Sequence, residues 1–89
     1  GGISFEPYTP EFNSLLKGRI RERDDFVCQL CDITEKKHGK KLSIHHIDYN
    51  KSNCADYNLL ALCRSCNSKV NKDREYWMSY FSNSAYAYL

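Results

Sequence analysis

The sequence predicts a small α+β domain in which a short β-hairpin lies among helices and two paired-cysteine turns. Three observations support this prediction. The chain has 89 residues, which allows one domain, and it is 42% hydrophobic and 27% charged, as folded chains are. Segments with strand character lie between segments with helical periodicity. Five cysteines are present, and a chain this short usually needs a metal, disulfides or a partner to support its core.

The first element that we expect is a helix from Pro10 to about Arg23. Thr9 is a candidate cap, and proline is tolerated at the first helical position. Apolar side chains that recur at helical spacing are expected to face the core, and they are Phe12, Leu15, Leu16 and Ile20. Residues 1–8, which contain glycines and a proline, are expected to form an extended arm.

Two short strands are expected in the middle of the chain. Residues 42–47 are rich in apolar and β-branched side chains, and residues 58–63 form a second apolar segment. Polar segments surround the first strand, so residues 32–41 and 48–57 are expected to be loops.

The C-terminal part is expected to hold two helices. The first runs to about Asn71, and Asp73 is a candidate cap for the second. The second helix carries aromatic side chains at helical spacing, which we interpret as core residues: Tyr76, Trp77, Tyr80 and Phe81. We therefore expect a single domain over residues 9–82 and a tail over residues 83–89.

Four of the cysteines form two identical pairs, Cys28-x-x-Cys31 and Cys63-x-x-Cys66. Each pair bends the chain so that both sulfurs can point at one centre, and four thiolates complete a tetrahedral Zn²⁺ site without an open position. We therefore expect one structural Zn²⁺. The alternatives are two disulfides or four unrelated buried thiols. Disulfides are the less favoured alternative, because the sequence shows no secretion signal. Cys54 lies outside both pairs and is expected to be a packing residue.

A group of imidazole and amide side chains accompanies the two cysteine pairs. His45, His46 and Asn58 lie between the pairs, and Asn67 follows the last cysteine. Taken singly, a histidine on an apolar strand is often a core residue, and an asparagine is often a turn or helix cap. The order of all these residues is more informative than any one of them.

That order resembles the zinc-stapled branch of the HNH nucleases, also called ββα-metal nucleases. The resemblance covers Arg19 to about Phe81, and the segments that carry it are residues 21–24, 28–31, 42–49 and 58–69. It implies a ββα-metal fold with a structural four-cysteine zinc site and flanking N- and C-terminal helices. It also implies a metal-dependent DNA endonuclease or nickase that leaves 5′-phosphate and 3′-hydroxyl ends, either free-standing or as the nuclease domain of a larger assembly.

The resemblance also implies roles for individual residues. His46 would be the general base that activates water, and Asn58 would fix the loop that carries this base. His45 and Asn67 would bind a catalytic divalent cation, and the amide oxygen of Asn67 favours Mg²⁺ or Mn²⁺ over Zn²⁺. In a regular strand the two histidines would point to opposite faces, so we expect the chain to bend between them.

A DNA partner, double-stranded or locally opened, follows from the same resemblance. The net charge of +2 is too small to indicate such a partner by itself. Basic residues near the proposed centre are expected to contact phosphates, and they are Arg64, Lys69, Lys72, Arg74, Arg19 and Arg23. Other subunits or domains could supply target specificity.

A second hypothesis remains open, in which the chain is a non-catalytic zinc module that binds DNA or protein. The sequence also bears on location, because it contains no long apolar run and no signal-peptide pattern. We therefore expect a cytoplasmic protein without a membrane partner.

Overall fold

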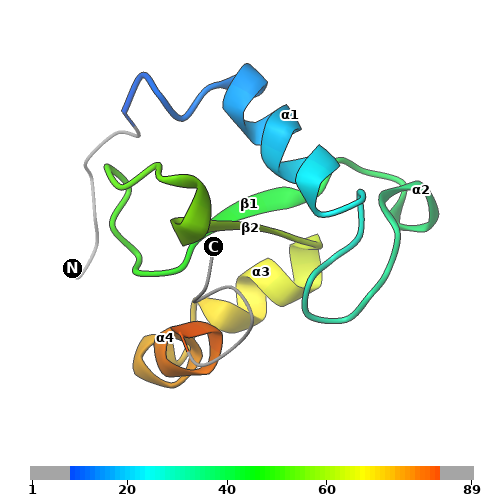
Figure 1. The fold of residues 1–89 in the computed structure, drawn as a ribbon. Helices are drawn as coiled ribbons and strands as arrows, with labels where there is room; N and C mark the ends of the chain where they lie inside the picture. Colours follow the sequence, from blue (N-terminus) through cyan, green and yellow to red (C-terminus); the bar gives the residue numbers. More distant parts are fainter. Residues whose placement is uncertain (1–8, 83–89) are drawn as a thin grey trace.

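The computed structural model describes residues 9–82 (Figure 1). Its elements, in chain order, are α1 (Ser14–Arg23), α2 (Glu35–His38), β1 (Ser43–His46), the 3-10 turn η1 (Asp56–Asn58), β2 (Leu59–Leu62), α3 (Arg64–Val70) and α4 (Arg74–Ser82). The predicted small α+β class is therefore confirmed. The arm expected over residues 1–8 and the tail expected over 83–89 lie outside the described residues.

The centre of the fold is a two-stranded antiparallel sheet of β1 and β2. Ser43 pairs with Leu62, and the register continues to His46, which pairs with Leu59. Both predicted strands are confirmed, each one residue shorter at either end. Because side chains alternate along a strand, Ile44 and His46 share one face of the sheet, and His45 lies on the other.

Helices cover both faces of this hairpin, with α1 on one side and α3 and α4 on the other (Figure 1). Against α1, the buried cluster consists of Leu16, Ile20 and Leu59. The larger cluster lies on the opposite face and includes Leu60, Leu62, Val70 and Phe81. His46 therefore faces the α1 layer, whereas His45 faces the layer of α3 and α4.

The first helix begins later than the sequence suggested. It starts at Ser14, and its cap is Asn13, whose side-chain oxygen accepts the backbone N–H of Leu16 at 2.9 Å. Thr9 does not cap a helix, because its hydroxyl oxygen lies 3.6 Å from the sulfur of Cys54. The predicted start at Pro10 was therefore wrong by one helical turn.

Several side chains that we expected in the core are exposed. Leu15 is 81% exposed, because it points away from the sheet while Leu16 faces it. On α4, Phe81 is 1% exposed, but Tyr76 and Tyr80 remain at 55% and 47%. Only one side of α4 meets the hairpin, so the helical spacing of its aromatic residues led us to expect too many buried side chains.

Within residues 9–82, no helix combines the length and the apolar character that a membrane span requires.

The segment expected to be a loop over residues 32–41 contains the short helix α2. Thr34 caps it by accepting the backbone N–H of Lys37 at 3.1 Å. Gly39 ends it with φ +82°, a left-handed conformation that glycine adopts at little cost. We expected a loop because the segment is polar and rich in lysine, but its residues form one helical turn with a cap at each end.

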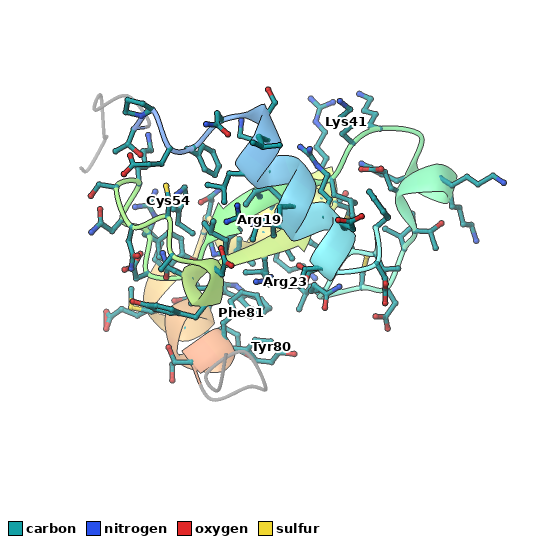
Figure 2. All side chains as sticks on the ribbon, turned by 45° about the horizontal axis from the view of Figure 1, so that its top comes forward. Arg19, Arg23, Lys41, Cys54, Tyr80 and Phe81 are labelled. Atoms are coloured by element: carbon teal, nitrogen blue, oxygen red, sulfur yellow. The ribbon has the colours of Figure 1, made fainter. Side chains whose placement is uncertain are left out.

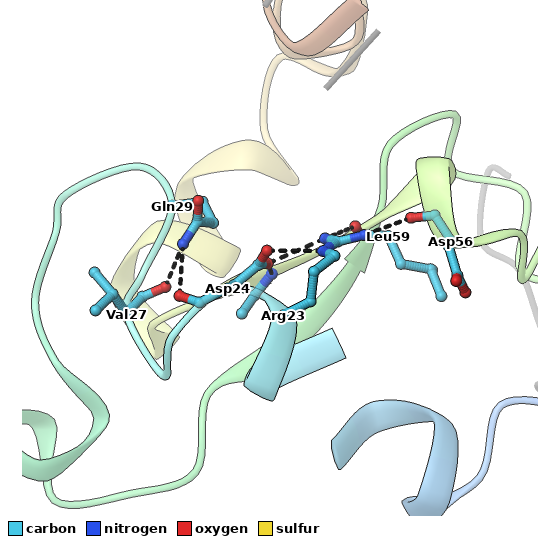
Figure 3. A network of polar contacts seen from close by, with 7 residues as sticks. Arg23, Asp24, Val27, Gln29, Asp56 and Leu59 are labelled. Carbon is cyan, nitrogen blue, oxygen red and sulfur yellow. Dashed lines mark hydrogen bonds and ion pairs between the residues drawn. The ribbon is translucent and has the colours of Figure 1, made fainter. Parts of the chain in front are cut away.

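A network of polar contacts ties the end of α1 to the outer edge of β2 (Figure 3). The carboxylate of Asp24, which is 7% exposed, accepts the backbone N–H of Ala61 at 2.9 Å and binds the guanidinium of Arg23. Arg23 also donates to the carbonyl oxygens of Asp56 and Leu59. These contacts occupy most of the guanidinium donors, so a structural role explains Arg23 better than the predicted DNA contact.

Gln29 extends this network to the first cysteine turn. Its backbone N–H donates to the carbonyl of Ala61 at 2.9 Å, and its side-chain amide donates to the carbonyls of Asp24 and Val27. The outer edge of β2 is therefore joined to both α1 and the turn that holds Cys28.

Candidate functional site

The two cysteine pairs converge on one point. The four sulfurs of Cys28, Cys31, Cys63 and Cys66 lie within 4.8 Å of one another, and those of Cys31 and Cys63 are 3.7 Å apart. A tetrahedral zinc ion with Zn–S bonds of about 2.3 Å separates its sulfurs by about 3.8 Å. The predicted grouping is confirmed, no disulfide forms, and the cluster could hold a structural metal such as zinc.

The protein environment prepares Cys28 to be a metal ligand. Burial by itself raises the pKa of this thiol, but hydrogen bonds from the backbone N–H groups of Cys63, Cys31 and Leu30 outweigh burial and lower the pKa to about 7. Because metals bind the thiolate form, this environment favours coordination. Burial raises the pKa of Cys66, so that thiol would lose its proton when a metal binds.

The cysteine cluster also fixes the position of α3. Cys63 is the N-cap residue of this helix, and its carbonyl oxygen accepts the backbone N–H of Asn67 at 2.8 Å. A metal held by the four sulfurs would thus join the segment before α2 to the junction of β2 and α3.

His45 is a buried histidine with an unsatisfied ring nitrogen. Its side chain faces α3 and α4, where its ring lies edge-on to Tyr49 at 5.0 Å and 5.9 Å from the ring of Phe81. The Nε2 atom is buried and hydrogen-bonds to no described residue. Burial is the main reason why the pKa of His45 falls to about 4, so its imidazole is neutral at pH 7. A buried nitrogen without a partner costs about 1–3 kcal/mol unless something binds it.

His46 lies on the opposite face of the sheet. Its ring centroid is 4.6 Å from that of Phe12, and its Nε2 atom is 4.0 Å from the sulfur of Cys54. The residue is 6% exposed, and burial lowers its pKa. Sequence reasoning did not place either Phe12 or Cys54 beside this histidine, because Phe12 is distant in the chain and the contact with Cys54 depends on how the loop after β1 folds back.

The bend expected between His45 and His46 is absent. Both residues pair regularly with β2, so β1 continues unbroken through them. The chain turns only afterwards, where Tyr49 adopts φ +62° and its backbone N–H donates to the carbonyl of His46. The pairing of β1 with β2 requires extended backbone, which is why the two rings diverge.

Asn58 closes the loop between the strands. Its side-chain oxygen accepts the backbone N–H of Asp48, and its side-chain amide donates to the carboxylate of Asp48 and the carbonyl of Asn53, both at 2.9 Å. The residue is 4% exposed. Burial raises the pKa of Asp48, but hydrogen bonds from Asn53, the backbone of Asn50 and Asn58 lower it overall. Sequence reasoning identified Asn58 but missed Asp48 as its partner.

Asn67 lies in α3 beside the outer edge of β1. Asn67 lines a groove at this edge together with Ser43 and Ile44, the two residues that precede His45 in the strand. Its backbone carbonyl accepts the side-chain amide of Asn71. The structure therefore brings Asn67 to β1, from the helix that the cysteine cluster anchors.

The predicted basic contacts are distributed unevenly. Arg64, Lys69 and Lys72 are exposed on or after α3. The guanidinium of Arg74 lies 4.9 Å from the ring of Tyr49, in a cation–π contact. Two further residues have protein partners, since Arg19 forms an exposed ion pair with Asp56 at 2.9 Å and Arg23 belongs to the network described above.

Comparison with known proteins returned no match among protein-family models, curated proteins or solved structures.

Proposed function

We propose that the chain is a metal-dependent DNA endonuclease or nickase of the HNH type. The observation that carries this proposal is His45, whose buried neutral ring has a nitrogen without a hydrogen-bond partner among residues 9–82. Uncharged imidazole is the form that binds metal ions. The order β1, β2 and α3, with two of the four clustered cysteines at the start of α3, supports a ββα-metal arrangement.

The catalytic cation in this proposal is Mg²⁺ or Mn²⁺. His45 would hold it from β1 and Asn67 from α3, and an amide oxygen is a hard ligand that suits these ions. When bound, the cation would neutralise negative charge on the phosphate and on the leaving 3′ oxygen. Cys63 caps α3 and Cys66 lies within it, so a metal held by the cysteine cluster would anchor the helix that carries Asn67.

His46 is the proposed general base. Burial lowers its pKa, so at neutral pH the ring is uncharged and able to take a proton from water. Phe12 covers this ring, at 4.6 Å between centroids. The proposal therefore requires the Phe12 side chain to move away when DNA binds, so that water can reach His46. It also requires β1 to bend between His45 and His46, because regular pairing with β2 directs the two rings to opposite faces of the sheet.

A second candidate function is a zinc module that binds DNA or protein without cutting. The position of His46 favours it, because the ring is 6% exposed and β1 directs it away from His45. In that case both histidines would be packing residues of the hairpin.

The two candidates differ in one assay, which is the relaxation of supercoiled plasmid by zinc-loaded protein with Mg²⁺ or Mn²⁺. His38 on α2 supplies a matched control, because it is the third histidine and is only half-buried. The nuclease predicts that wild type and His38→Ala nick the plasmid. It predicts a loss of about 10²-fold or more for His46→Ala, while the zinc content stays unchanged.

The variant Phe12→Ala distinguishes a nuclease whose general base is covered by Phe12 from a module that binds DNA without cutting it. Removal of the ring opens His46 to water, so a nuclease should nick faster than wild type. If neither wild type nor Phe12→Ala cuts DNA under these conditions, while both still bind it, the non-catalytic module is the correct function.

A further inference from the structure

A positively charged groove follows the outer edge of β1, between α1 and α3. Its volume is about 310 Å³, and its polar lining consists of Lys17 and Arg21 from α1, Lys41 and Ser43 around the start of β1, and Asn67 from α3. We propose that this β1-edge groove binds the phosphodiester backbone of a nucleic-acid strand. The choice of a nucleic acid rests on the proposed function, but binding in the groove does not depend on cleavage.

The basic residues of α1 divide between two sides of the helix. Lys17 and Arg21 are four residues apart and therefore share the side that faces the groove. Arg19 and Arg23 share the other side, where both contact Asp56. Among residues 9–82, no acidic side chain lines the groove. The positive charge on the Lys17 side is thus open to a ligand, whereas the positive charge on the Arg19 side is largely used within the protein.

Arg21 is held in a position suited to phosphate. Its side chain is 15% exposed, and its Nε donates to the carbonyl of Leu42 at 2.8 Å. The carboxylate of Glu35 lies 4.0 Å from Nε, while the two terminal nitrogens donate to no described residue. A guanidinium fixed at Nε presents its remaining donors as a planar fork, which matches two phosphate oxygens.

Two lysines extend the positive charge along the groove. The ammonium of Lys17 lies 4.5 Å from the ring centroid of Phe12, so it stays close to the groove wall. Lys41 is exposed and lies among other nitrogen-tipped side chains at the margin of the molecule beside α1 (Figure 2). Cations spread along a groove suit a polymer with repeated negative charges better than a single small anion.

The edge of β1 also offers a backbone donor. Ile47 donates its N–H to the carbonyl of Asn58 across the hairpin. Hydrogen-bonded and non-hydrogen-bonded pairs alternate in an antiparallel ladder, so the N–H and C=O of Ile44 point away from β2. No described residue hydrogen-bonds to either group. Backbone N–H groups commonly bind phosphate oxygens, and this one opens on the groove.

The outer edge of β2 provides a contrast. There, the N–H and C=O of Ala61 are both satisfied, by Asp24 and by Gln29. The fold thus covers one edge of the hairpin with its own polar groups and leaves Ile44 on the other edge available. This asymmetry indicates which edge receives the ligand.

The test is DNA binding without Mg²⁺ or Mn²⁺, so that cleavage plays no part. Zinc-loaded variants are titrated against a fluorescein-labelled DNA duplex, and against a single strand of equal length, at several KCl concentrations. Lys17→Gln and Lys41→Gln each remove one groove cation. Lys36→Gln is the matched control, because Lys36 is exposed on α2 and does not line the groove.

Each groove variant should lower the slope of log K against log salt by about 0.9 for duplex, which is about an eightfold loss of affinity near 0.1 M salt. Lys36→Gln should change affinity by less than about twofold. The nucleic-acid form that shows the larger loss is the form that the groove accepts. Circular dichroism of each variant verifies that these substitutions leave the fold intact.

Equal losses in Lys36→Gln and Lys17→Gln would overturn the proposal, because only overall charge would then matter. So would unchanged affinity in both groove variants. Displacement of the duplex by polyglutamate of equal charge would also overturn it, since the groove would then fit an acidic protein. If the protein does not nick plasmid but its DNA binding depends on the groove residues, the nuclease proposal is rejected and the groove proposal stands. If the protein nicks plasmid but its DNA binding does not depend on the groove residues, the groove proposal is rejected and the nuclease proposal stands.

Discussion

Asp24→Asn is predicted to destabilise the protein severely while leaving the cysteine cluster intact. The wild-type carboxylate accepts three hydrogen bonds, two from the guanidinium of Arg23 and one from the backbone N–H of Ala61. An amide of the same shape has one oxygen and one NH₂ group. Whichever way it is oriented, the NH₂ group faces at least one donor, and the charge that pairs with Arg23 is gone.

The size of the effect follows from burial. Asp24 has a side chain that is 5% exposed, so a donor left without an acceptor there costs about 1–3 kcal/mol. The side chain of Arg23 is 28% exposed, which lets solvent replace part of the lost ion pair, worth about 1 kcal/mol. The total is about 3 kcal/mol. For a domain of this size, it corresponds to a fall in melting temperature of about 15 °C.

Thermal unfolding, followed by far-UV circular dichroism in zinc-containing buffer, measures this fall. Asp25→Asn is the matched control, because Asp25 is exposed and its φ of +60° is one that asparagine tolerates. A fall of less than about 5 °C for Asp24→Asn, or an equal fall for the control, would refute the reasoning from buried hydrogen bonds.

Three further predictions concern the metal, the loop and the buried histidine. Removal of the structural metal by a chelator should unfold the chain, because zinc binding contributes on the order of 10 kcal/mol to the folding free energy of small modules. The measurement is the loss of helical circular dichroism when a chelator is added and its recovery when zinc is restored. Asn58→Ala removes three buried hydrogen bonds and should cost about 3 kcal/mol in urea unfolding, whereas Asn71→Ala, at an exposed position, should cost less than about 1 kcal/mol. The pKa of His45 is about 4 in the folded protein, against 6.5 unfolded. The unfolded chain therefore binds more protons between these values, and stability should fall by about 3 kcal/mol as pH drops from 6.5 to 4. His45→Asn should show a shallower fall, and an identical pH dependence would contradict the burial of a neutral ring.

The cysteine spacing and the alternation of apolar residues predicted the centre of this fold. Two Cys-x-x-Cys turns leave few ways to arrange four sulfurs, and the hairpin of β1 and β2 follows from short apolar segments on either side of a polar loop. These are local signals, because each depends on residues close together in the chain.

Contacts between distant segments could not be predicted in the same way. Thr9 resembles a helix cap in the sequence, but it contacts Cys54, and the helix begins at Ser14 with Asn13 as its cap. From the sequence alone, Lys17 and Arg21 are indistinguishable from an ordinary solvated helix face. Only the fold shows that they line a groove beside the edge of β1. The direction of His46 depends on how far strand pairing extends, which a motif does not specify.

The most direct measurement of the central claim is paramagnetic broadening of amide signals by Mn²⁺ in the zinc-loaded, ¹⁵N-labelled protein. If a second cation binds between β1 and α3, substoichiometric Mn²⁺ should broaden the signals of His45 and Asn67 first, and His45→Ala should abolish that selectivity. Broadening centred on exposed carboxylates such as Asp32 or Glu22, with His45 and Asn67 unaffected, would contradict the account.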